Sequence, residues 1–372
     1  MLILIYVYYY INSNKMSTLN YIGSKKTLLD FINSVIDKIN KNFDDKTTVK
    51  FLDGFAGSGI VGKYFNNKYG YITSSNDMEY YSYVISYALL KVPYSEKLKM
   101  ELGNINKLVK TDNTDYNLIT ENYSEKGKDK RKFWITSNAQ KADAIIEYIN
   151  KNYNNGTLTN DEKIFLLASL ISSIDKLANT ASVYGAFLKK YKKSAEKTLE
   201  VKAIHNNLEI TNVNNNISHN LDINELAKND YIYDIVYLDP PYNNRQYSSN
   251  YHPLNFIAKY DKTIIPYGKT GLHNNLNKSK FSISKSVIDT FAELVNNIRA
   301  KYILLSYNNE GLMSSDTIKK VLEIKGKTTL YKYLYKKFKS QKIQIDAQVY
   351  EYLYLCEVGT IGEFTTVIVN QI

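Results

Sequence analysis

The sequence predicts an α/β fold built on a mostly parallel sheet. Two short and largely apolar runs, at residues 49–52 and 234–238, each stop at an aspartate, Asp53 or Asp239. Glycines follow the first aspartate, and two prolines follow the second. An apolar run with such an ending is typical of a parallel strand that is covered on both faces. Helical patterns follow the first of these strands and the next one along the chain, as parallel connections require.

The composition indicates a protein with its own core and a polyanionic partner. The chain has 372 residues, a formal net charge of +11 and a sequence pI of about 9.1. Such a positive balance favours nucleic acid as the partner, although it does not prove one. The 35 tyrosines have AT-rich codons, like the plentiful Asn, Lys and Ile. We therefore attribute most of them to codon usage rather than to base stacking.

Cysteine and histidine usage argues against disulfide and metal sites. Cys356 is the single cysteine, so no intramolecular disulfide can form, and its apolar neighbours in the sequence predict a core thiol. The four histidines are scattered and suggest no zinc site.

Residues 1–16 are expected to form an N-terminal extension that is non-native or disordered. Their apolar run, residues 1–11, is too short to span a bilayer and lacks the basic leader of a signal peptide. We expect Met16 to be the functional start, and an extra strand at residues 1–11 is the alternative. No long apolar segment follows, so we expect a cytoplasmic protein.

The next segments are candidate ligand sites. Tyr21-Ile-Gly-Ser-Lys25 precedes a helical pattern over residues 27–39. Its Gly-Ser pair exposes backbone N–H groups at a helix start, where they can meet an anion or serve as an ordinary cap. Val49 to Gly59 reads as a strand, a glycine turn and a helix from about Ile60. The glycines allow a ligand to approach the backbone closely, although such a turn alone is weak support for a nucleotide site.

A second acid follows the next strand. A strand at about residues 71–75 is followed by Asp77, which lies 24 residues after Asp53 (77 − 53), and then by a helix over residues 79–91. An acid at this offset commonly binds ribose hydroxyls. It can also cap the helix that it precedes, and the two roles are compatible.

Residues 97–216 interrupt the strand pattern with many Asn, Lys and Tyr and with mainly helical signals. Residues 161–177 form an amphipathic pattern opened by an acidic turn. Residues 189–193 contain four lysines, which either form a solvated face or contact phosphates. Residues 217–222 then read as a third strand that ends in an acid, Asp222.

The stretch Asp239-Pro240-Pro241-Tyr242 has the residue types that methylation of a nucleobase amine requires. Such an amine is a poor nucleophile because its lone pair is delocalised into the ring. The Asp239 carboxylate and the Pro240 carbonyl can accept its two N–H bonds and stabilise the positive charge that develops. The prolines fix the direction of the carbonyl, and Tyr242 offers a face for a flipped base. A proline turn with a packing tyrosine is the alternative.

Two polar loops and the end of the sheet follow. Residues 243–252 and 278–281 are polar and basic, as either DNA-contacting or plain surface loops are. A helix over residues 287–299, a strand over 302–306 and a loop over 307–311 come next. Residues 328–338 and 349–356 read as an antiparallel pair that closes the sheet.

Asp239-Pro-Pro-Tyr242 resembles the catalytic motif of amino-group DNA methyltransferases, which use S-adenosylmethionine. Over residues 20–358 the order of N-terminal motif, cofactor motifs, insertion and catalytic motif is similar to that of the Dam-like, alpha-group N6-adenine methyltransferases. The loop after Tyr242 resembles that of a subset of type II adenine methylases. Gly54 is a departure, because some relatives have proline before Phe55. Three stretches of the insertion are similar to stretches of related adenine methylases: Asn138-Ala-Gln-Lys, Asp175-Lys-Leu-Ala-Asn179-Thr and Tyr184-Gly-Ala-Phe-Leu-Lys-Lys.

The resemblance implies a Rossmann-like methyltransferase sheet, mostly parallel with an antiparallel last strand. The catalytic domain would comprise residues 17–96 and 217–372, and residues 97–216 would be a mainly helical target-recognition insertion. The implied catalytic residues are Asp239, Pro240, Pro241 and Tyr242. The residues implied for S-adenosylmethionine binding are Tyr21, Gly23, Lys25, Asp53, Phe55, Ala56, Gly57, Gly59, Asp77, Asp222 and Asp239. Those implied for DNA binding are Lys189, Lys190, Arg245, Tyr247, Asn250, Lys278 and Lys280.

The resemblance also implies the reaction. A methyl group would pass directly from S-adenosylmethionine to the N6 amine of a flipped adenine in double-stranded DNA, without a covalent enzyme intermediate or a metal. We expect a prokaryotic or viral enzyme that acts as a monomer or weak dimer, with a cognate restriction endonuclease as its functional partner.

Other activities stay open at this point. Methylation of the cytosine N4 amine is the main alternative, and RNA or protein-glutamine methylation is a further one. Methylation of a cytosine ring carbon would need a well-placed cysteine nucleophile, which Cys356 is not. A DNA-binding protein without catalysis would not need acids at successive strand ends.

Overall fold

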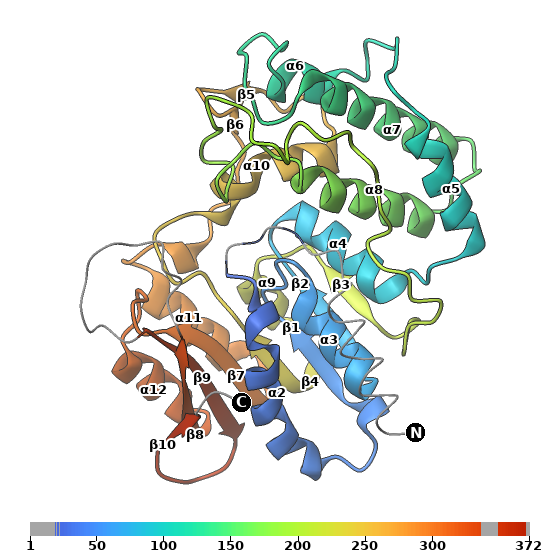
Figure 1. Ribbon diagram of the computed structural model, residues 1–372. Helices are drawn as coiled ribbons and strands as arrows, with labels where there is room; N and C mark the ends of the chain where they lie inside the picture. Colours follow the sequence, from blue (N-terminus) through green and yellow to red (C-terminus); the bar gives the residue numbers. More distant parts are fainter. Residues whose placement is uncertain (1–18, 20, 22, 336–348, 370–372) are drawn as a thin grey trace. The chain divides into compact units, whose positions relative to one another are not determined.

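The computed structural model describes residues 19, 21, 23–335 and 349–369, so the extension and the start predicted within residues 1–16 lie outside the described residues. The described chain divides into two compact units (Figure 1). The sheet unit comprises residues 24–79, 211–247 and those described after residue 276. The helical unit comprises residues 80–210 and 248–276, together with those described before residue 24.

The sheet unit is built on an eight-stranded sheet. Its strands are β1 (Lys50–Asp53), β2 (Ile72–Asn76), β3 (Ile217–His219), β4 (Ile232–Leu238), β7 (Arg299–Asn308), β8 (Gly326–Tyr335), β9 (Val349–Val358) and β10 (Thr365–Val369). They lie in the order β10-β8-β9-β7-β4-β1-β2-β3. Among these strands, β9 runs antiparallel to β7 and β8, and the other pairings are parallel. The mostly parallel sheet and the antiparallel β8–β9 pair are therefore confirmed.

Helices cover both faces of this sheet (Figure 1). The helices are α2 (Leu29–Ile39) and α3 (Ile60–Tyr69) on one face, and α9 (Ile223–Ala227), α11 (Val287–Asn297) and α12 (Ser315–Glu323) on the other. On the first face, the rings of Phe65 in α3 and Phe51 in β1 have centroids 5.3 Å apart. On the second, Phe291 of α11 belongs to one buried cluster with Leu52 and Val236. Because side chains alternate along a strand, Phe51 and Leu52 serve opposite layers.

Local sequence explains where the central elements start and stop. Phe51 and Val236 are fully buried within β1 and β4, as the apolar runs predict. β4 stops where two prolines begin, since proline has no backbone N–H for the ladder. α3 is bounded by Gly59 and Gly70, with φ of 70° and 75°, in the left-handed region that favours glycine.

The helical unit packs around one buried helix. Its elements are α4 (Tyr80–Lys91), α5 (Glu96–Asn106), α6 (Leu118–Tyr123), α7 (Thr136–Asn154), α8 (Asn160–Asp175), most of α10 (Tyr247–Lys259), and the hairpin of β5 (Pro266–Tyr267) and β6 (Leu272–His273). α8 packs against α4, α5 and α7. A capping box between Thr159 and Glu162 opens α8, which matches the acidic helix start expected near residue 161. No described helix is long and apolar enough to cross a bilayer.

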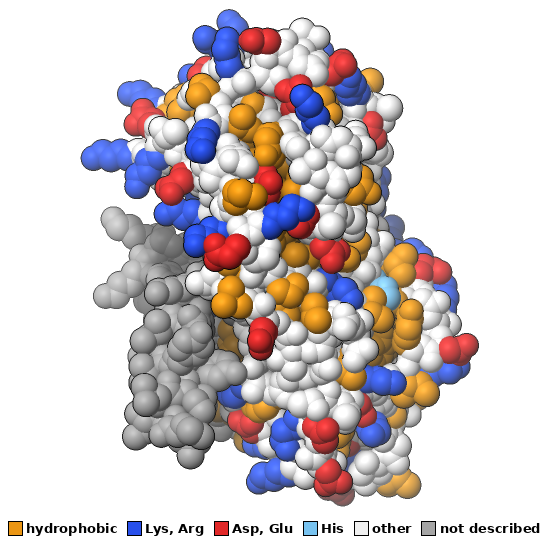
Figure 2. All heavy atoms as spheres, turned by 90° about the vertical axis from the view of Figure 1, so that its right-hand side faces the viewer, with side chains coloured by type: hydrophobic (Ala, Val, Ile, Leu, Met, Phe, Trp, Pro, Cys, Tyr) orange, Lys and Arg blue, Asp and Glu red, His pale blue; other side chains and the backbone are white. Residues whose placement is uncertain are grey.

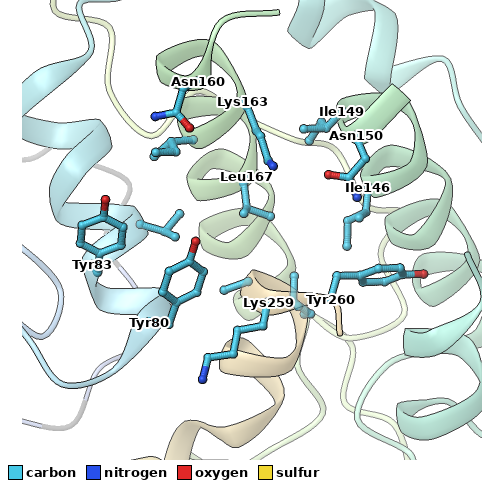
Figure 3. A pocket seen from close by; sticks show the side chains of 14 residues that line it. Tyr80, Tyr83, Ile146, Ile149, Asn150, Asn160, Lys163, Leu167, Lys259 and Tyr260 are labelled. Carbon is cyan, nitrogen blue, oxygen red and sulfur yellow. The ribbon is translucent and has the colours of Figure 1, made fainter. Parts of the chain in front are cut away.

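Figure 3 shows a hollow among α4, α7, α8 and α10. Its floor is aliphatic, with Val84, Ile146 and Ile257 all buried. Tyr80 and Lys163 are among the polar residues that line it. None of the site residues expected from the sequence lines this hollow, so we assign it to helix packing.

Three boundaries differ from the sequence expectation, and one expected strand extends past the described residues. The loop expected over residues 243–252 is helical from Tyr247, because the face of α10 that contains Leu254 is buried and overrides the polar signal. Arg299 starts β7 instead of ending the preceding helix. The strand expected over 217–222 ends at His219. Residues 336–338 of the expected strand 328–338 lie outside the described residues, and the sequence gives no signal that we recognised for β10.

Candidate active site

The Asp-Pro-Pro-Tyr motif lies at the carboxyl edge of the sheet. β4 pairs in parallel with β1 and β7, so β1 and β4 end at the same edge. Asp53 is the last residue of β1, and Asp239 directly follows the last residue of β4. The structure therefore brings these two sequence-identified acids to the ends of neighbouring strands, where ligands of open α/β sheets bind.

Lys25 forms a buried ion pair with Asp239. Nζ of Lys25 lies 2.6 Å from Oδ2 of Asp239, and the two side chains are 6% and 16% exposed. Burial alone would lower the pKa of Lys25, but the carboxylates of Asp239 and Glu351 raise it overall. Burial raises the pKa of Asp239, and Lys25 partly offsets that rise. The protonated lysine thus helps to keep Asp239 a carboxylate, which is the form that can accept two N–H bonds.

Glu351 belongs to this site but was missed in the sequence. Glu351 lies near the start of the antiparallel strand β9, where it pairs with Asn308, the last residue of β7. The reversed direction of β9 brings Glu351 to the carboxyl edge of the sheet. The pKa of Glu351 is raised to about 7, mainly by burial; the charge of Lys25 opposes this rise and that of Asp239 adds to it. An acid inside the apolar and aromatic run 349–356 is the signal that could have revealed it.

Asp53 has one oxygen without a hydrogen-bond partner among the described residues. The N–H of Gly62 donates to its Oδ2 at 2.9 Å, whereas its Oδ1 is buried and accepts no such bond. The pKa of Asp53 is raised to about 7, mainly by burial. The Gly62 hydrogen bond opposes this rise, and the charge of Asp239 adds to it. A buried acceptor of this kind fits a ligand that brings its own polar hydrogens.

Asp77 holds the glycine turn after β1. Its Oδ2 accepts the N–H of Gly57 at 2.7 Å, and its Oδ1 accepts the N–H of Glu79 at 2.8 Å. Gly57 has φ of 51°, so the turn requires a residue that tolerates the left-handed region. The N–H of Ala56 donates a 2.9 Å hydrogen bond to the carbonyl of Asn76 in β2. The turn is therefore preformed.

Asp222 caps a helix. Its carboxylate accepts the N–H of Asn224 at 2.9 Å at the start of α9. Asn76, which the sequence analysis missed, ties this segment to the glycine turn, because its amide donates to the carbonyls of Gly54 and Leu221. The segment with Asp222 thus lies beside the turn, while the contact of Asp222 with a ligand stays a prediction.

Two residues expected at the base and cofactor sites have aromatic neighbours in the sheet unit. Tyr242 is half-buried and packs edge to face on Tyr307, with ring centroids 6.4 Å apart. Its carbonyl accepts the N–H of Leu312 at 3.1 Å. Phe55 packs edge to face on Phe281 at 5.2 Å. These contacts limit the motion of both rings.

The two loops expected to contact DNA are joined to each other. The side chain of Gln246 donates to the Ser279 carbonyl at 3.1 Å and accepts the Ser279 N–H at 2.8 Å. Arg245, Lys278 and Lys280 are exposed on these loops. The sequence could not show this pairing, which joins two separate basic stretches within the sheet unit.

The remaining expected contacts lie on other elements. Tyr247 and Asn250 are part of α10, and the Asn250 carbonyl accepts the N–H of Tyr184 at 2.9 Å. Lys189 and Lys190 are exposed in the helical unit.

The N-terminal motif is split between the units. Tyr21 stacks on Tyr251 in the helical unit, with ring centroids 5.0 Å apart. Gly23 has φ of 81°, and Lys25 starts the 3₁₀ turn η1 (Lys25–Leu28) of the sheet unit. Of these residues, Lys25 is the one that we place at the catalytic motif.

Within the insertion stretches that carry the family resemblance, Asn138, Asp175 and Tyr184 are buried in the helical unit. The side chain of Asn138 donates to the Lys197 carbonyl and accepts the Leu199 N–H, both at 2.8 Å. The Tyr184 hydroxyl donates to Asp175 at 2.8 Å. These hydrogen bonds stabilise the fold of the helical unit.

Across the described chain, no group of three or more His, Cys, Asp or Glu could hold a metal ion.

Comparison with known proteins assigns the chain to a family. Residues 21–350 match the model of the D12 class N6 adenine-specific DNA methyltransferases. The type II methyltransferase M.NlaIII of Neisseria lactamica is 38% identical over 91% of this chain and 99% of its own length. M.CviAII of Paramecium bursaria Chlorella virus 1 is 37% identical over 91% and 98%. M.FokI of Planomicrobium okeanokoites is 35% identical over 90% of this chain but 52% of its own length.

Proposed function

Because the chain belongs to the D12 class N6 adenine-specific DNA methyltransferases, we propose that Asp239, Pro240 and Tyr242 hold the target adenine at the carboxyl edge of β4. The Asp239 carboxylate and the Pro240 carbonyl accept the two N–H bonds of the N6 amine. Pro241 fixes the direction of that carbonyl, and the ring of Tyr242 stacks on the flipped base. The observation that carries this assignment is the buried 2.6 Å ion pair between Lys25 and Asp239.

Lys25 and Asp239 act together in this proposal. A buried carboxylate is driven towards its neutral form, which would have only one oxygen free to accept. Lys25 opposes this, and Glu351 shares the lysine charge. When the amine attacks, positive charge develops on N6, and the carboxylate of Asp239 stabilises it. Asp239 is therefore a catalytic residue, and Lys25 is a positioning residue that acts through Asp239.

The turn between β1 and α3 fits S-adenosylmethionine. This cofactor supplies the methyl group when it is bound. Asp53 offers a buried oxygen without a partner among the described residues. Gly57 and Gly59 leave the backbone open to close approach. We assign cofactor contacts to Lys25, Asp53, Phe55, Ala56, Gly57, Gly59, Asp77, Asp222 and Asp239, with Tyr21 and Gly23 of the N-terminal motif.

The helical unit and the joined basic loops are proposed to bind double-stranded DNA. Arg245, Lys278 and Lys280 of the sheet unit, Lys189 and Lys190 of the helical unit, and Tyr247 and Asn250 of α10 are the proposed contacts. The enzyme would act in the cytoplasm as a monomer or weak dimer. A cognate restriction endonuclease would be its functional partner, as the type II names of its relatives suggest.

Two substitutions separate cofactor binding from catalysis. Asp239→Ala removes one of the assigned cofactor contacts but should still bind S-adenosylmethionine in calorimetry through the others, while it transfers no methyl group to DNA. Asp53→Ala should lose cofactor affinity. Asp289→Ala, on an exposed position of α11, is the matched control and should keep both properties. Turnover of Asp239→Ala at the wild-type rate would overturn the assignment of Asp239.

A further inference from the structure

Two lysine-rich loops lie together in the helical unit. The first, residues 124–132, has exposed Lys126, Lys128 and Lys130, and the second, residues 188–193, has exposed Lys189, Lys190 and Lys193. Of the two, only the second run is among the phosphate contacts that the sequence predicts. None of these six lysines has an ion pair or a side-chain hydrogen bond with another described residue. The nearby Asp129 is instead neutralised by Arg131, at 2.7 Å.

One buried amide joins the two loops. Asn179 is fully buried, and its Nδ2 donates to the carbonyls of Lys132 and Leu188, both at 3.0 Å. Its Oδ1 accepts the N–H of Lys192 at 3.1 Å. The backbone adds a bond from the Leu188 N–H to the Asn179 carbonyl at 2.9 Å. A single side chain therefore sets the spacing of both loops.

The first loop is also fixed to the body of the unit. Gly127 packs so tightly on α6 that a Cβ would lie 2.1 Å from the Glu121 carbonyl oxygen. Arg131 is buried and donates to the carbonyls of Asn122 and Gly268, both at 2.9 Å. The second loop is tied to the first by the Tyr191 hydroxyl, which donates to Glu125 at 2.6 Å.

These bonds distinguish the loops from an ordinary solvated lysine run. Six ammonium groups are held on ordered backbone, where they repel one another unless a polyanion is bound. Ordered backbone also lowers the entropy that binding would cost. On the face of the molecule that Figure 2 shows, Lys and Arg side chains are interspersed with Asp and Glu side chains.

We propose that the 124–132 and 188–193 loops form one phosphate-binding surface, the lysine surface, for the backbone of the DNA that contains the target adenine. Asn179 is its positioning residue. The assignment rests on the proposed function, since it takes double-stranded DNA as the substrate. It adds Lys126, Lys128, Lys130 and Lys193 as contacts. Lysines that meet phosphates as point charges set affinity and register, not base choice.

The salt dependence of DNA affinity tests this proposal. Each phosphate contact contributes about 0.9 to the slope of log affinity against log salt concentration. With a short DNA duplex as probe, Lys128→Gln with Lys130→Gln should reduce the slope by about 1.8, and so should Lys189→Gln with Lys190→Gln. The control pair is Lys107→Gln with Lys151→Gln, exposed lysines of the same unit, and should leave the slope unchanged.

Asn179→Asp tests the positioning role, because it removes no lysine. It should lower the slope while thermal unfolding and S-adenosylmethionine binding report a folded enzyme. An effect on melting temperature alone, with a wild-type slope, would show that Asn179 is merely structural.

Two outcomes separate this proposal from the proposed function. A wild-type enzyme that methylates DNA, with slopes unchanged in both lysine pairs, would overturn the lysine surface, including the contacts of Lys189 and Lys190, and leave the proposed methylation standing. A wild-type enzyme that neither binds nor methylates DNA would overturn both. Binding of an acidic protein by this surface without any effect on DNA affinity would also overturn the proposal.

Discussion

Replacement of Lys25 by methionine should shift the pH dependence of methyl transfer. Two unit charges 2.6 Å apart attract by about 6 kcal/mol at an effective dielectric constant of about 20. Removal of one partner from a buried ion pair typically costs about 3–5 kcal/mol. Without Lys25, Asp239 avoids this cost by taking up a proton, so its pKa should rise further.

The direction in which the pH profile shifts depends on which protonation state of Asp239 is active. Burial already raises the pKa of Asp239, and the ionised carboxylate is the acceptor of the amine. Activity of the wild-type enzyme should therefore fall as pH drops through the pKa of Asp239. In Lys25→Met this acid limb should move to higher pH, so that kcat/KM on the acid side of the profile falls below that of the wild type.

The assay is kcat/KM for DNA methylation between pH 5.5 and 9, with calorimetry of S-adenosylmethionine to check the cofactor site. Lys26→Met is the matched control, because Lys26 is the exposed neighbour of Lys25. It should reproduce the wild-type profile. A Lys25→Met profile that superimposes on the wild type would refute the coupling of Lys25 to Asp239.

Three further predictions concern Glu351, the glycine pair Gly54 and Gly103, and Tyr242. Burial raises the pKa of Glu351 to about 7, so the wild type should lose stability as pH rises from about 4.5 through 7, and thermal unfolding of Glu351→Gln should show less of this loss. Gly54→Ala places a Cβ 2.9 Å from the Leu238 side chain on β4. It should lower the free energy of unfolding by about 1–3 kcal/mol, as measured with denaturant. Gly103→Ala has open space in α5 and should gain about 0.5–1 kcal/mol. Tyr242→Ala should weaken transition-state binding of DNA by about 1–3 kcal/mol, Tyr242→Phe should retain most activity, and equal loss in both would exclude stacking as its role.

The parts of the fold that depend on neighbouring residues could be predicted from the sequence. β1 and β4 are apolar runs closed by an acid and by glycine or proline, and these signals lie within about ten residues. The start of α8 could be predicted because its cap and its acidic first turn are adjacent in the chain. The order of the motifs then identified the sheet and the family.

The features of the fold and the site that depend on contacts between distant residues could not be predicted from the sequence. Glu351 reaches the site of Lys25 only because β9 is inserted antiparallel between β7 and β8. The pairing of Gln246 with Ser279, and of both lysine loops with Asn179, joins segments that carry no complementary pattern. α10 was missed because polar residues and Pro253 masked a buried helix face.

Single-molecule sequencing of plasmid DNA tests the central claim most directly. The plasmid would come from a host without methylation that expresses the wild type or Asp239→Ala. We predict N6-methyladenine at one short motif with the wild type, and no modification with Asp239→Ala although this variant still binds S-adenosylmethionine. Modification of the cytosine amine, or equal adenine methylation by both proteins, would contradict the account.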